Sequence, residues 1–74
     1  MFIARLTYRY YFGTRPDQCR DHVEGYYTTI DKARTVVREL LGANATDDTT
    51  FGFDVWTSPA HPHVEYLIDL VEVR

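Results

Sequence analysis

The chain has 74 residues, 45% of them hydrophobic and 26% charged, which is the composition of one folded domain over residues 1–74. Its net charge of −3 argues against a general nucleic-acid binder, which carries a basic excess. No stretch approaches the roughly 18 apolar residues of a membrane span, and the first residues do not resemble a signal peptide. We therefore expect a cytoplasmic protein with no membrane partner.

The first element that the sequence predicts is a strand over residues 2–12. Aromatic and β-branched residues alternate there with a period of two. We expect the even positions to face a helix: Phe2, Ala4, Leu6, Tyr8, Tyr10 and Phe12. The odd positions then face the other way: Ile3, Arg5, Thr7, Arg9 and Tyr11.

The next segment is ambiguous in the sequence. Residues 13–20 have the glycine, proline and aspartate of a turn, and residues 22–27 read as a short strand with a bulge or bend at Gly25. A short helix over residues 16–24 is an alternative, because proline is accepted in a first helical turn.

The segment from Thr28 to Gly42 predicts a helix. Apolar residues recur there at helical spacing, which defines one buried face: Ile30, Ala33, Val37 and Leu40, with Val36 and Leu41 at its flanks. Thr28 is the expected N-cap, with Asp31 in the capping-box position, and Gly42 is expected to end the helix in the left-handed conformation.

After the helix, residues 43–50 read as a polar loop and residues 51–57 as a strand. We expect the apolar side of that strand to be Phe51, Phe53 and Val55, and the opposite side to carry Asp54 and Trp56. A turn over residues 58–62 leads to the last strand, residues 63–73, with Val64, Tyr66, Ile68 and Leu70 on one side.

These elements predict an α+β fold in the order β-(β)-α-β-β. One helix packs on one face of a three- or four-stranded antiparallel sheet. The other face then meets water or a partner. If the first and last strands are neighbours, Arg5 and Arg9 can pair with Asp69 and Glu65 across the strands.

The exposed face is therefore the predicted site of partner binding. Trp, Tyr and Arg dominate the energetics of protein interfaces. The residues that we expect in this site are Arg5, Arg9, Tyr11, Asp54, Trp56, Glu65, Leu67 and Asp69. A homodimer through the same face is an alternative.

The sequence offers no catalytic or metal-binding motif that points to an enzyme. His61 and His63 stand two residues apart at a turn, while Cys19 and His22 lie elsewhere, so no ligand set is indicated. Cys19 with His22 at a spacing of three, without an orienting group, does not indicate nucleophilic catalysis. We expect no enzyme activity and no cofactor.

The stretch from Tyr26 to Ala33, YYTTIDKA, resembles the start of the helix in small proteins of phages and mobile elements, anti-CRISPR proteins among them. There a strand ends in an aromatic residue, a Thr or Ser caps the helix, and a two-stranded hairpin follows it. The resemblance covers the helix and the order of elements. It implies an inhibitor without enzyme activity that occludes a site on a larger host complex.

Three functions follow as hypotheses. The first is a protein-binding module that blocks a host defence complex, such as a nucleic-acid-binding CRISPR effector. Its acidic side chains would engage a basic surface: Asp47, Asp48, Asp54, Glu65, Asp69 and Glu72. The second is a nucleic-acid-binding regulator that uses Arg5, Arg9, Arg34 and Arg38. The third is an oligomer-forming structural or virion subunit.

Overall fold

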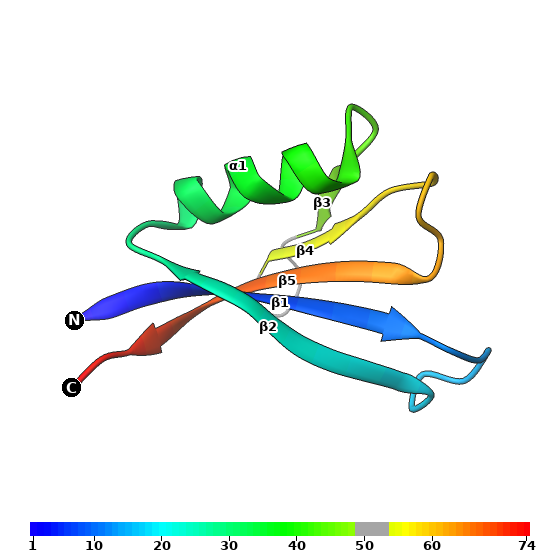
Figure 1. Ribbon diagram of the computed structural model, residues 1–74, viewed down its shortest axis with the longest axis horizontal. Helices are drawn as coiled ribbons and strands as arrows, with labels where there is room; N and C mark the ends of the chain where they lie inside the picture. Colours follow the sequence, from blue (N-terminus) through cyan, green and yellow to red (C-terminus); the bar gives the residue numbers. More distant parts are fainter. Residues whose placement is uncertain (49–53) are drawn as a thin grey trace.

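The computed structural model describes residues 1–48 and 54–74, and it contains one helix and one sheet (Figure 1). The elements are β1 (Phe2–Tyr11), β2 (Cys19–Tyr27), α1 (Ile30–Leu41), β3 (Thr46–Asp48), β4 (Asp54–Thr57) and β5 (Val64–Glu72). The strands form an antiparallel sheet in the order β2-β1-β5-β4-β3. The predicted α+β class is confirmed, with five strands in place of three or four.

The helix lies along one face of the sheet, and no described element lies over the other face (Figure 1). The core forms between α1 and the middle of the sheet. It is built from Ala4, Leu6, Ala33, Val37, Leu41, Trp56, Tyr66 and Ile68. The strands extend beyond the twelve-residue helix, so Phe2, Tyr10 and Phe12 are exposed although they share the parity of Leu6.

The helix begins one residue later than Thr28 predicts. Thr29 is the N-cap, and its hydroxyl accepts a hydrogen bond from the backbone N–H of Lys32 at 3.3 Å. The helix ends at Gly42, where φ is +84° and the N–H donates to the carbonyl of Arg38 at 2.9 Å. This end was predicted correctly.

The buried face of α1 is confirmed at Ala33 and Val37 and differs from the prediction at its last turn. Leu41 is 4% exposed, whereas Leu40, which we expected to face the sheet, is 47% exposed. Ala33, Val37 and Leu41 repeat at a spacing of four, and this row lies directly over the sheet.

Strand β2 settles the ambiguous segment, because residues 19–27 pair with β1 along their whole length. The alternative helix over residues 16–24 is therefore wrong. The predicted irregularity at Gly25 is confirmed. Leu6 pairs with Gly25 and Thr7 pairs with Val23, which leaves Glu24 as the extra residue of a β-bulge.

The strand after the helix departs most from the prediction. Residues 46–48, expected to be loop, form a short edge strand that pairs with β4. In β4, Asp54 and Trp56 face the helix, and Val55 pairs with Leu67 on the other face. Phe51 and Phe53 lie outside the described residues.

Candidate functional site

The face of the sheet opposite α1, here called the open sheet face, is ordered in rows that run across the strands. The strand register places one largely apolar row in the middle: Val23, Thr7, Leu67 and Val55. A charged row lies on each side of it. One contains Asp21, Arg9 and Glu65, and the other contains Tyr26, Arg5 and Asp69.

Two bidentate ion pairs lie in these charged rows. Arg5 donates from Nε to Asp69 Oδ1 at 3.0 Å and from Nη2 to Oδ2 at 2.6 Å. Arg9 donates in the same way to Asp21, at 2.8 and 3.0 Å. The parallel geometry fixes both guanidinium planes as well as neutralising their charge.

The electrostatic effect of each pair follows from these contacts. The hydrogen bonds and charge of Asp69 raise the pKa of Arg5, and those of Asp21 raise the pKa of Arg9. In return, hydrogen bonding from Arg9 lowers the pKa of Asp21. Arg5, Arg9 and Asp21 are therefore ionised across the physiological range.

Sequence reasoning paired Arg5 with Asp69 correctly but chose the wrong partner for Arg9. Glu65 does lie opposite Arg9 on β5, as predicted. However, β2 extends to Cys19 and brings Asp21 to the other side of Arg9, where it forms the bidentate pair. Glu65 instead acts on Tyr11, whose pKa it raises by hydrogen bonding, with a further contribution from burial.

A shallow cavity of about 210 Å³ lies between the two ion pairs. Its floor is Thr7 and Leu67 of the middle row, and its walls are Arg5, Arg9, Asp21 and Asp69. Leu67 is only 8% exposed, between its cross-strand neighbours Thr7 and Val55 at the bottom of this cavity. The cavity therefore offers an apolar floor between two fixed guanidinium groups.

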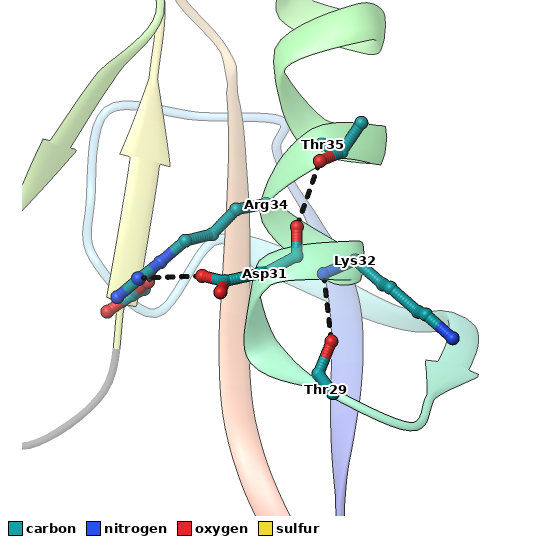
Figure 2. A network of polar contacts seen from close by, with 6 residues as sticks. Thr29, Asp31, Lys32, Arg34 and Thr35 are labelled. Atoms are coloured by element: carbon teal, nitrogen blue, oxygen red, sulfur yellow. Dashed lines mark hydrogen bonds and ion pairs between the residues drawn. The ribbon is translucent and has the colours of Figure 1, made fainter.

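Two residues predicted for this site lie on the opposite side of the sheet. Trp56 is 4% exposed and packs in the core, with the guanidinium of Arg38 5.2 Å from the centre of its ring. Asp54 accepts a hydrogen bond from Arg34 Nε at 2.6 Å. Figure 2 shows this side of the molecule, where Arg34 also lies 3.6 Å from Asp31.

The site includes residues that sequence reasoning missed. Tyr26 is 58% exposed, and Val23 and Asp21 lie beside it on β2. The alternation of residues 19–23 held the signal for Asp21 and Val23, but the turn assigned to residues 13–20 and the alternative helix obscured it. Tyr26 lies in the predicted strand over residues 22–27, but the bulge at Glu24 reverses the face on which it lies. The six remaining predicted residues, Arg5, Arg9, Tyr11, Glu65, Leu67 and Asp69, do share the open sheet face.

The four arginines of the nucleic-acid hypothesis do not form one surface. Arg5 and Arg9 lie on the open sheet face, whereas Arg34 and Arg38 extend from the helix on the other side. Three of the four, Arg5, Arg9 and Arg34, form ion pairs with aspartates. This separation removes the continuous basic track that a nucleic-acid backbone needs.

Cys19 and His22 cannot act together, because they lie on opposite faces of β2. Cys19 pairs with Tyr11 and His22 with Tyr8, whose side chains alternate across the sheet. Among the residues described, no three His, Cys, Asp or Glu side chains are placed to hold a metal ion.

Comparison with protein-family models, curated proteins and solved structures finds no significant match to this chain. Within residues 1–48 and 54–74, no helix has the length and apolar character needed to cross a membrane.

Proposed function

We propose that this chain is a protein-binding module without enzyme activity, and that the open sheet face is its binding surface. The observation that carries the proposal is the cavity over Leu67 between two bidentate Arg–Asp pairs. Rigid arginine side chains beside an apolar floor lose little entropy on binding, so they favour the energetics of an interface.

The chemistry of the face specifies the partner. A guanidinium group has five N–H donors, and Arg5 uses two of them on Asp69, which leaves three for a ligand. The matching surface is that of a folded protein that inserts one apolar side chain over Leu67. It would present carbonyl or carboxylate oxygens to Arg5 and Arg9.

The exposed residues of β2 extend this surface. Tyr26 and Val23 stand more than half exposed at the end of the charged and apolar rows. Tyrosine contributes large contact area with few rotatable bonds, so Tyr26 is the expected aromatic anchor beside the arginines.

The narrower role, inhibition of a host defence complex by occlusion, rests on the resemblance of residues 26–33 to small phage and mobile-element proteins. Direct nucleic-acid binding is disfavoured by the paired arginines.

The test compares two double variants of matched composition. Arg9→Ala/Tyr26→Ala removes a wall and the anchor from the open sheet face. Tyr10→Ala/Arg15→Ala removes the same residue types from the other face of β1 and from the exposed loop after it. Wild type and both variants are immobilised and exposed to a nuclease-treated extract of the cells that naturally make the chain.

We expect one protein to be retained by wild type and by the control variant and lost from the open-face variant. With the purified partner, the open-face variant should bind at least about thirtyfold more weakly, since each hot-spot truncation costs about 1–2 kcal/mol. A second extract is left without nuclease. The proposal for this face is wrong if no retained protein discriminates between the two variants, or if wild type retains a protein only from the untreated extract.

A further inference from the structure

Strand β2 is the long free edge of the sheet. It has nine residues, whereas β3 at the opposite edge has three. No described element lies beyond β2 (Figure 1). A long edge strand presents backbone N–H and C=O groups that can pair with a further strand.

The segment from Arg20 to Glu24 is the part of this edge that precedes Gly25, and its last residue, Glu24, is the extra residue of the bulge. Arg20 pairs with Tyr10 and His22 with Tyr8, so both project on the helix side of the sheet. Glu24 follows His22 by two positions, and we place its side chain on this side as well; after burial, the charge of Glu24 is a further cause of the raised pKa of Tyr66, which lies on the helix side. The bulge follows at Glu24 and ends the regular alternation.

The charges of this segment are self-complementary. When two antiparallel copies are aligned on His22, Arg20 of each copy lies opposite Glu24 of the other, on the same side of the sheet. Asp21 then lies opposite Val23, and Asp21 keeps its own partner Arg9 within each copy.

Neighbouring registers are less favourable. Alignment on Asp21 places Asp21 against itself, and alignment on Glu24 places Glu24 against itself, with like charges opposed at the two-fold axis. A shift by one residue would bring helix-side residues against open-face residues, which the pleat of the sheet does not allow. Alignment on Val23 opposes no like charges, but it places Arg20 opposite Tyr26 and so forms no Arg20–Glu24 pair. The register centred on His22 is therefore the one that opposes arginine to glutamate.

We infer that two copies of this chain associate through β2, antiparallel and centred on His22, with two reciprocal Arg20–Glu24 pairs. The two five-stranded sheets then join edge to edge into one sheet of twice that number. The two-fold axis is perpendicular to the sheet, so both helices lie on the same face. The two open sheet faces form one continuous surface that carries two cavities.

The pairing involves five residues on each side, so its interface is smaller than the standard size of a stable protein complex. We therefore expect a dissociation constant in the range of tens to hundreds of micromolar. Sedimentation equilibrium over about 5 to 500 μM covers this range and should show the mass rise from 8.7 kDa toward twice that value.

The decisive experiment uses charge reversal. Arg20→Glu alone places Glu opposite Glu in both pairs, and Glu24→Arg alone places Arg opposite Arg. Each single variant should dimerise at least about tenfold more weakly than wild type. Mixing the two single variants restores opposite charges at both positions, so the mixture should form a heterodimer at wild-type affinity.

Circular dichroism of each single variant establishes that it is folded before the mixture is made, and both substitutions are at exposed positions. Three results would overturn the inference. The wild type could remain a monomer at the highest concentration, its dimer could be indifferent to both charge reversals, or the mixture could associate no better than the single variants.

Discussion

The ion pair between Arg34 and Asp54 connects the helix to β4, and its two ends differ in exposure. The Asp54 side chain is 10% exposed, whereas the Arg34 side chain is 30% exposed and has Asp31 as a second carboxylate at 3.6 Å. Removing Arg34 leaves a buried carboxylate without its cation. Removing the charge of Asp54 leaves an arginine that can turn to solvent and Asp31.

This difference in exposure determines how much stability each substitution should cost. A hydrogen bond to a charged group contributes about 1.5–3 kcal/mol, and a buried charge left alone costs more than one that remains hydrated. We expect Arg34→Ala to lower the free energy of unfolding by about 2 kcal/mol and Asp54→Asn by about 1 kcal/mol. For a domain of this size, 2 kcal/mol corresponds to a fall in Tm of about 8–16 °C.

The double variant Arg34→Ala/Asp54→Asn completes the cycle. It removes the orphaned charge together with its partner, so it should be about as stable as Arg34→Ala alone rather than less stable by the sum. The assay is urea unfolding followed by circular dichroism and by the fluorescence of Trp56, which report on secondary structure and core packing. Glu39→Ala, at an exposed position of the same helix, controls for helix propensity.

The reasoning would be refuted if the effects of the two substitutions on the free energy of unfolding were additive. If the two single costs sum in the double variant to within about 0.3 kcal/mol, the two side chains do not interact in solution. An equal or larger cost for Asp54→Asn than for Arg34→Ala would also refute the assignment of Asp54 as the buried partner.

Three further outcomes follow from the structure. Because Arg9 lowers the pKa of Asp21, their pair stabilises the fold above pH about 4 and is lost below it. Asp21→Asn should therefore lower the free energy of unfolding at pH 7 by at most about 1 kcal/mol, and it should make this free energy depend less on pH in the acid range. Partial desolvation and the charge of Asp54 raise the pKa of Asp47, which penalises the folded state at neutral pH. Asp47→Asn should therefore raise Tm at pH 7, and the gain should disappear as the pH falls below the ordinary pKa of 3.8. Gly42→Ala should lower the free energy of unfolding, measured in urea, by about 1–3 kcal/mol, because φ of +84° with ψ of −168° is almost exclusive to glycine. Asn44→Ala, in the same loop, is the control and should have little effect.

The elements that sequence reasoning predicted well are those with long, regular patterns. β1 and β5 each alternate over nine or ten residues, and Gly42 ends a helix with a repeating apolar face. In these cases the period of the pattern and the geometry of the element agree over several turns or pleats. The pairing of Arg5 with Asp69 followed from that regularity.

Strand β4 shows why the rest could not be predicted. Alternation separates Asp54 and Trp56 from Val55, but it does not identify the face that meets the helix. An aspartate on the core side looked unfavourable until the structure placed Arg34 beside it. Residues 46–48 have no strand pattern of their own, and they pair because β4 offers them an edge.

The same limit applied to the open sheet face. Its rows depend on the register of four strands, β2, β1, β5 and β4. Asp21 lies beside Arg9 because β2 begins earlier than its polar sequence suggests. Contacts between residues in different strands are set by pairing partners, which a single sequence does not reveal.

The placement of β1 beside β5 also has a kinetic consequence. Their pairing brings together residues as far apart in sequence as Arg5 and Asp69, which are 64 positions apart, at the centre of the sheet. A nucleus that contains this pair must close a long loop before any contact repays the entropy, so folding should be slow for so short a chain. On a ribosome, β1 and β2 would remain an unsupported hairpin until β5 emerges.

A circular permutant that joins Arg74 to Met1 and opens the chain between Gly13 and Gln18 would make β5 and β1 sequential neighbours. Because the permutant also separates β1 from β2, it should refold faster only if the pairing of β1 with β5 limits the rate. Equal or slower refolding in stopped-flow measurements would show that the β1–β2 hairpin forms first.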